Sequence, residues 1–203
     1  MSKPENMTHV SLDLETMGQK KDAAIIAIGA CFFNPLSGEI GEQFYTQVNL
    51  DIGNGVSNGD VTPSTIIWWL KQSDEARQKF FDNEKAPDIY TALCEFGKFI
   101  FQSQDVQVWG NGISFDNTIM ESAYDRHFKN EAPWEFYRER DVRTMVEIGE
   151  QIGVYPKRDL PFEGERHYAL ADAIHQAKII HTVWRSIKDL HTKNMPTLQL
   201  LKN

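Results

Sequence analysis

The sequence has few cysteines and no long apolar run, and both absences narrow the class of protein. The two cysteines, Cys31 in IGACFF and Cys94 in ALCEFG, lie in apolar surroundings without the spacing of metal ligands. This favours reduced core thiols in a cytoplasmic protein. No apolar run reaches the length of a membrane-spanning helix, and the polar start MSKPENMTHV is not typical of a signal peptide. We therefore expect a cytoplasmic protein with no membrane partner.

Basic residues are also in short supply. Lys and Arg total 21 against 29 Asp and Glu, which gives a formal net charge of -8. A protein that wraps duplex nucleic acid through a broad basic surface is therefore not expected. The charge still permits an enzyme that holds a short stretch of phosphate through metal ions, because bound cations locally reverse the charge of their carboxylate ligands.

The chain has no internal repeat and no low-complexity segment, and its 203 residues fit one α/β domain. Apolar and alternating stretches predict strands at 8–14, 23–34, 43–50, 105–110 and 135–142, with a hairpin turn at 35–42. Helical spacing and capping signals predict helices at 62–72, 86–103, 114–128, 143–153 and 168–190. A Gly/Asn-rich stretch at 51–60 and the segment at 154–167 are expected to be loops. This order predicts a mixed five-stranded sheet with helices on both faces.

An acidic pair closes the first predicted strand. In THVSLDLETMG, Asp13 and Glu15 stand two positions apart, so their side chains point to the same face of a strand. Like charges side by side repel, and partial burial adds to the cost, so a cation between them is expected. Composition alone gives about four such acidic triplets by chance. The pair is informative because it closes a strand, where α/β sheets bind ligands.

Asp116, His167 and Asp172 are candidates to act together with this pair, because of where they stand relative to the predicted strands and helices. Asp116 follows the predicted strand at 105–110 and, taken alone, equally fits a first-turn acid that interacts with the helix dipole. His167 and Asp172 stand five residues apart at the opening of the last helix. That offset does not share one helix face, so His167 is expected in the loop or at the cap. Each residue taken alone also fits a structural or surface role.

Together, the segments SLDLETMG, NGISFDNTIM and HYALADA resemble the three motifs of the DEDDh family of 3′–5′ exonucleases. Their order and spacing match from about residue 8 to 185, and the histidine of the third motif is typical of the h branch. The ETMG turn and the IIWWL helix are similar to the corresponding segments of small bacterial and phage-type exonucleases, including the exoribonuclease AS group. The resemblance implies a ribonuclease H-like fold, with one exonuclease domain over residues 1–203 and a peripheral C-terminal tail.

The resemblance also implies the chemistry and the catalytic residues. Hydrolysis of a phosphodiester places an anionic nucleophile on an anionic phosphorus, and two divalent ions, Mg²⁺ or Mn²⁺, can promote it. Asp13 would bridge both ions. Glu15 and Asp172 would hold the ion that activates water, and Asp116 would serve the ion near the leaving 3′-oxygen. His167 would be the general base, for which an imidazole is suited.

Several residues are candidates for substrate contact. The resemblance extends to Thr16, Met17, Gly18, Asn111 and Phe115, although Met17 departs from the Glu-Thr-Thr-Gly and Glu-Met-Thr-Gly turns common in related branches. Trp69, in preference to Trp68, is a candidate for base stacking, with core packing as the alternative, since adjacent helix residues point about 100° apart. Arg166, with Lys157 and Arg158, precedes His167 and is a phosphate candidate. A second basic cluster is Arg138, Arg140 and Arg143, for which salt bridges to Glu135 and Glu139 are the alternative.

We therefore predict a metal-dependent enzyme that removes nucleoside 5′-monophosphates from the 3′ end of single-stranded nucleic acid, with RNA preferred. A phage-type DNA exonuclease is the close alternative, because the sequence contains no readable sensor of the 2′-hydroxyl. A two-metal endonuclease of the same fold and a catalytically silent nucleic-acid-binding module are the rivals from other classes. The complete set of four acids and a histidine argues against the silent module. The relatives suggest a homodimer, which the sequence does not decide.

Overall fold

The computed structural model describes residues 7–50, 59–81, 85–129 and 132–194. Most of the predicted loop at 51–60, and the tail beyond residue 194, lie outside these ranges. The strands are β1 (His9–Thr16), β2 (Ile25–Phe33), β3 (Ile40–Gln47), β4 (Gln107–Gly110) and β5 (Glu139–Asp141). The helices are α1 (Pro63–Leu70), α2 (Asp74–Phe81), α3 (Ile89–Ile100), α4 (Asp116–Phe128), α5 (Val142–Gln151), α6 (Pro156–Asp159) and α7 (Ala169–Asn194). Within the described ranges, no helix is both long and apolar enough to cross a membrane.

The strands form one mixed sheet in the order β3-β2-β1-β4-β5. The first three strands pair antiparallel in chain order, in agreement with the hairpin turn predicted at 35–42, whereas β1 with β4 and β4 with β5 are parallel pairs. The hairpin between β2 and β3 is closed by two backbone bonds, from the Asn34 N–H to Glu39 O and from the Gly38 N–H to Asn34 O. The predicted five-stranded mixed sheet is confirmed.

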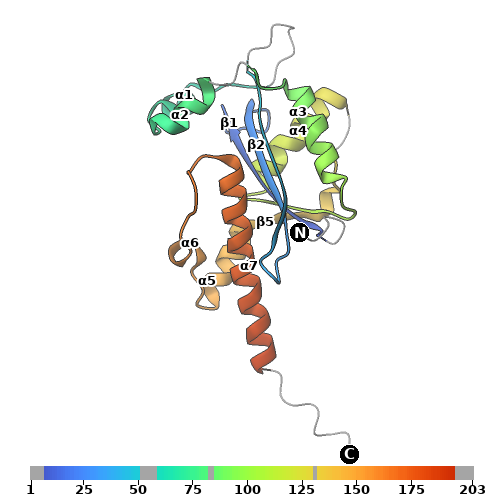
Figure 1. Ribbon diagram of the computed structural model, residues 1–203, viewed down its shortest axis with the longest axis vertical. Helices are drawn as coiled ribbons and strands as arrows, with labels where there is room; N and C mark the ends of the chain where they lie inside the picture. The colour runs from blue at the N-terminus through green and yellow to red at the C-terminus, as the bar shows by residue number, and fades with distance from the viewer. Residues whose placement is uncertain (1–6, 51–58, 82–84, 130–131, 195–203) are drawn as a thin grey trace, which may run out of the picture.

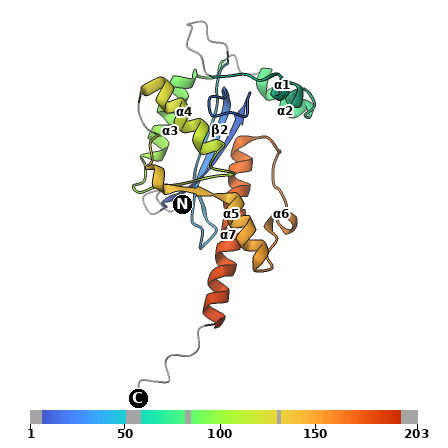
Figure 2. The same cartoon turned by 180° about the vertical axis from the view of Figure 1, so that it is seen from behind.

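Helices cover both faces of the sheet (Figures 1 and 2), as predicted. Leu12 and Leu14 of β1 belong to the core cluster shared with Phe96 of α3 and Ile119 of α4. The opposite face carries α5 and α7, where residues such as Ile180 form a second core cluster. Because side chains alternate along a strand, Asp13 and Glu15 point away from the first core and toward α7.

A glycine allows α7 to approach the sheet closely beside Asp13. Gly29 of β2 is the direct cross-strand partner of Asp13. A Cβ at this position would stand 2.1 Å from the carbonyl carbon of Ala169 and 2.2 Å from the nitrogen of Leu170. The first turn of α7 therefore rests on the backbone of β2, which brings the acid of that helix to the end of β1.

Some local predictions differ from the structure. The strand predicted at 135–142 is shorter, because residues Phe136–Arg138 form a 3₁₀ turn before β5. Helix α4 begins at Asp116, two residues after the predicted start at 114, and its cap position is Phe115, which makes no side-chain cap bond. The polar α2 lacks the apolar periodicity that predicts a helix, and the Arg77 guanidinium links it to α1 through the carbonyl of Leu70. The short α6 lies in the segment predicted as a loop.

Candidate active site

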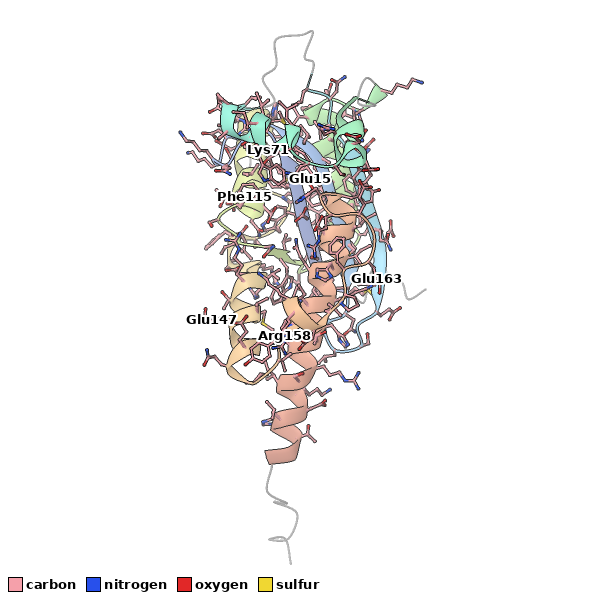
Figure 3. The ribbon with its side chains drawn as sticks, turned by 90° about the vertical axis from the view of Figure 1, so that its left-hand side faces the viewer. Glu15, Lys71, Phe115, Glu147, Arg158 and Glu163 are labelled. Carbon is pink, nitrogen blue, oxygen red and sulfur yellow. The ribbon has the colours of Figure 1, made fainter. Side chains whose placement is uncertain are left out.

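Three carboxylates meet where β1 ends and α7 begins. Asp13, Glu15 and Asp172 each offer an oxygen, and these atoms all lie within 4.8 Å of one another. Figure 3 shows Glu15 near the end of β1, between α1 and α7. The pair on β1 shares one face through strand alternation, whereas α7 supplies the third acid from a distant part of the chain only because its first turn lies on the sheet.

Asp116 lies beside this cluster and is held by two backbone donors. Its Oδ1 accepts the N–H of Leu14 at 3.2 Å, and its Oδ2 accepts the N–H of Asn111 at 3.0 Å. The side chain is only 2% exposed. Gly110 makes room for it, since a Cβ there would stand 3.2 Å from the Cβ of Asp116. Through these two hydrogen bonds, the carboxylate connects the loop after β4 to the end of β1.

Burial and mutual repulsion make ionisation of these acids costly. The pKa of Asp13 is raised well above its usual range by burial and by the negative charges of Asp116, Glu15 and Asp172. Burial raises the pKa of Asp116 to about 7, against the lowering effect of its two backbone donors. Burial likewise raises the pKa of Asp172. A cation bound among these carboxylates would stabilise their ionised forms, because it offsets their mutual repulsion.

Gln176 also belongs to this site. Its Nε2 donates to Oδ1 of Asp13 at 2.7 Å, from a side chain that is 4% exposed. The bond lowers the pKa of Asp13, against the effect of burial. Gln176 follows Asp172 by four residues on α7, so both project from the same helix face. That spacing is the sequence signal that could have identified Gln176, which the motif comparison missed.

His167 lies just before α7, as expected for a loop or cap position. Its backbone has a φ of +63°, in the left-handed region that residues other than glycine seldom adopt. Its N–H donates to Oδ2 of Asp172 at 2.9 Å, which fixes the segment to the acid cluster. The imidazole meets the Trp68 ring edge-on, with 4.9 Å between centroids. The five residues predicted to be catalytic therefore lie together.

The structure reverses the expected roles of the two tryptophans. Trp69 is 5% exposed, and its indole N–H donates to the carbonyl of Thr16 at 3.0 Å, so it packs inside and supports β1. Trp68 is 43% exposed and lines a cavity beside the acids. These contacts favour core packing, the alternative for Trp69, and make Trp68 the better placed of the two for contact with a base. The helical offset predicted that only one would face outward, but the direction depends on how α1 docks.

The cavity has a volume of about 360 Å³. Its lining residues are Thr16, Gly18, Gln19, Thr65, Trp68, Phe115 and Arg143. Three of the expected substrate-binding residues, Thr16, Gly18 and Phe115, are thus placed on its wall. Met17 and Asn111 are not in that lining; the backbone N–H of Met17 donates to Ala24 O, and that of Asn111 to Asp116.

The arginines predicted as phosphate-binding candidates lie at different distances from the acids. The Arg166 guanidinium lies over the Phe162 ring at 4.7 Å, and its charge opposes the rise in the pKa of Asp172. Arg158 pairs with Asp159 and lies far from Glu15 along the molecule (Figure 3). In the second basic cluster, Arg138 forms a salt bridge with Asp105 at 2.6 Å, and not with the glutamates named as the alternative. Arg143 alone of that cluster lines the cavity.

A mixed sheet with partly buried acids at the end of its first strand and a histidine before its last helix is typical of one class of protein, the DEDDh exonucleases of ribonuclease H-like fold. The sequence profile of the 3′–5′ exoribonuclease Rv2179c-like domain matches residues 8–184. The chain belongs to this family and is a 3′–5′ exonuclease. Membership implies divalent metal ions, and the acidic cluster offers the oxygen ligands that such ions prefer.

Individual relatives and solved structures agree with this assignment. The exodeoxyribonuclease of Enterobacteria phage T4 is 29% identical over 160 residues, covering 67% of this chain and 69% of its own. The nuclease domain of 3′hExo, a DEDDh family member solved with rAMP, superposes with a TM-score of 0.55 at 14% identity, covering 91% and 94% of the two chains. Exonuclease I of E. coli, solved with a dT13 oligonucleotide, gives a TM-score of 0.60 at 14% identity, covering 93% of this chain and 43% of its own. These structures support the ribonuclease H-like fold.

Proposed function

We propose that this exonuclease removes nucleoside 5′-monophosphates one at a time from the 3′ end of single-stranded nucleic acid, with RNA as the preferred substrate. The observation that carries the proposal is the cluster of Asp13, Glu15 and Asp172 within 4.8 Å, beside the buried Asp116. A protein that merely bound nucleic acid would gain nothing from carboxylates that repel both one another and the phosphate.

The donor set fits two Mg²⁺ or Mn²⁺ ions. Carboxylate oxygens are the hard ligands that these ions prefer. Burial and mutual repulsion raise the pKa of Asp13, so its ionisation is costly, and bound cations would offset that cost. Asp13 would help to hold both ions, Glu15 and Asp172 would hold the one that activates water, and Asp116 would hold the one near the leaving 3′-oxygen. When bound, such ions activate water and stabilise the leaving oxygen.

The chain's own groups perform the remaining tasks. An imidazole nitrogen of His167 takes the proton of the attacking water, while its backbone bond to Asp172 holds the residue at the acid cluster. Gln176 orients the carboxylate of Asp13 through their 2.7 Å bond. The cavity wall formed by Trp68 and Phe115 gives a terminal base aromatic surfaces against which to pack.

The family profile supports RNA, because it is that of an exoribonuclease domain and matches residues 8–184. DNA is the second candidate, and it is supported by the 29% identity to the phage T4 exodeoxyribonuclease. The deciding measurement is digestion of matched RNA and DNA oligomers, each labelled at one end, with Mg²⁺, with Mn²⁺ and with excess chelator. RNA should be shortened from its 3′ end, and only with metal. Equal or faster loss of DNA would reverse the preference, and turnover in chelator would contradict the metal assignment.

A circular single strand separates this proposal from an endonuclease of the same fold. An exonuclease cannot cut a circle, so any nicking under conditions that degrade the linear form would favour the endonuclease. We further propose that the chain acts as one exonuclease domain in the cytoplasm and that it forms a homodimer. Light scattering at several protein concentrations would test the dimer.

A further inference from the structure

The cavity beside the acids has one charged side chain in its wall. Of its seven lining residues, Arg143 is the only one that carries a charge, and the others are aromatic, small or neutral polar groups. A volume of about 360 Å³ lies within the range of small-ligand sites. A guanidinium in such a wall adds fixed hydrogen-bond donors suited to a phosphate.

The backbone at Gly112, in the NGISFDNTIM segment, leaves room for this guanidinium. Arg143 is the second residue of α5, and its Cζ would stand 3.2 Å from a Cβ placed on Gly112. Its Nη1 would stand 3.3 Å from the same atom. Gly112 has a φ of +90°, a conformation that L side chains rarely adopt. The absence of a side chain therefore lets the guanidinium lie against the loop that carries Asp116.

Arg143 differs from the arginines whose charge is already matched. Arg126, Arg138 and Arg158 each pair with an aspartate. Within the part of the chain that the structure describes, the Arg143 guanidinium forms no hydrogen bond or ion pair with an acidic side chain. Its donors are thus available at a cavity wall, in a chain of net charge -8 whose substrate is a polyanion.

Arg143 also lies on a definite side of the active site. Its guanidinium lies against Gly112, next to Asn111, whose N–H donates to Oδ2 of Asp116, whereas Arg166 lies over the Phe162 ring in the segment that leads to Asp172. Under the proposed function, Asp116 serves the leaving 3′-oxygen, which belongs to the penultimate nucleotide. The guanidinium is therefore on the side from which the remaining strand departs.

We propose that Arg143 binds the phosphodiester backbone upstream of the cleaved bond, through the phosphate of the penultimate nucleotide. This inference rests on the proposed function. Arg143 would anchor the strand that stays after each cleavage, so its contribution would appear with oligonucleotides and not with substrates that lack the upstream phosphate.

The test compares two substrates. One is a single-stranded oligonucleotide of the preferred sugar, and the other is the p-nitrophenyl ester of the matching nucleoside 5′-monophosphate, in which nitrophenolate replaces the penultimate nucleotide. For Arg143→Gln we expect kcat/KM to fall at least about tenfold more on the oligonucleotide than on the ester, mainly through KM. The slope of log KM against log salt should drop by about 0.7, the value for one phosphate contact on a single strand.

Two further variants complete the design. Arg143→Lys keeps the charge without the planar fork, so it should recover part of the loss in KM. Arg138→Gln removes an arginine that pairs with Asp105 away from the cavity, and it should match the wild type on both substrates. Melting temperatures show whether each variant is folded, and the exposed position of Arg143 makes a folding defect unexpected.

The outcomes distinguish this inference from the proposed function. A wild-type protein that cleaves neither substrate with metal would contradict the function itself. If the wild type is active and Arg143→Gln loses equal activity on both substrates, the guanidinium acts through Asp116 or the terminal nucleotide, and the upstream anchor is refuted. A loss that depends on the identity of the base would make Arg143 a base reader, which also refutes it.

Discussion

Replacing Asp116 by asparagine should change how the stability of the metal-free protein depends on pH. In the folded chain the pKa of Asp116 is raised from 3.8 to about 7, chiefly by burial. Between these values the unfolded chain has released the proton and the folded chain retains it. The contribution of Asp116 to stability therefore falls as pH rises from about 4 to 7 and is then constant, because the folded state binds more protons in that interval. An asparagine side chain carries no such proton, so this contribution should vanish in the variant, whereas the raised pKa values of Asp13 and Asp172 affect both proteins.

The magnitude follows from the size of the shift. One pH unit corresponds to about 1.4 kcal/mol, so the two units from pH 5 to pH 7 amount to roughly 3 kcal/mol. An asparagine amide would also face one of the backbone donors of Leu14 and Asn111, at a cost of about 1–3 kcal/mol. That cost does not vary with pH. We therefore expect Asp116→Asn to be less stable than the wild type at pH 5 and to gain roughly 3 kcal/mol on it by pH 8.

The assay is urea unfolding in excess chelator at pH 5 and pH 8, followed by tryptophan fluorescence. Burial lowers the pKa of His9 to about 4, which makes stability rise with pH up to about 6.5. This contribution is common to both proteins and cancels in their difference. Glu147→Gln, at an exposed position on α5, is the matched control and should show no pH-dependent difference. In melting experiments the expected gain corresponds to roughly 6–12 °C for a chain of this size.

A difference between Asp116→Asn and wild type that is flat from pH 5 to pH 8, or that moves against the variant, would refute the reasoning. It would mean that Asp116 is ionised in the folded protein at pH 5, so that its two backbone donors outweigh its burial. Adding Mn²⁺ provides an internal check, because a ligand of the folded state at a hundredfold excess over Kd adds about 2.7 kcal/mol. That gain should appear with the wild type at pH 8 and be much smaller in the variant.

His167→Ala should lower turnover by about 10²–10⁴-fold while calorimetry finds Mn²⁺ affinity retained, whereas Asp172→Ala should lose both; equal loss of metal by the two would make His167 a ligand or a support. Gln176→Leu, which removes the donor to Asp13, should weaken Mn²⁺ binding by roughly 10–100-fold in the same titration, and unchanged affinity would show that the bond is unimportant. Gly29→Ala should destabilise the protein by at least about 1–3 kcal/mol in urea unfolding, because backbone atoms of α7 occupy the space of the new methyl; a neutral effect would contradict that packing. A 3′-terminal phosphate should slow degradation of a labelled oligomer and a 5′ phosphate should not, and the opposite result would reverse the polarity.

The sequence by itself determined most of the helices and strands, and the shared strand face of the acidic pair. Alternation along β1 is a local property, so the shared face of Asp13 and Glu15 could be read from two positions. The strand order of the meander, the helix at α7 and the place of His167 before it also followed from local signals. The spacing of the three motifs was sufficient to predict the family, because ordered motifs in the right elements rarely coincide by chance.

Tertiary structure alone decided the contacts between distant segments. The bond from Leu14 to Asp116 spans 102 residues, and that from Gln176 to Asp13 spans 163. Which tryptophan faces the cavity depends on the docking of α1, and the place of Arg143 depends on Gly112 leaving room for its guanidinium. The pKa of Asp116 depends on burial, which no local pattern encodes. Local periodicity determines where a side chain points from its own element, whereas its neighbours, and therefore its chemistry, depend on how separate elements pack.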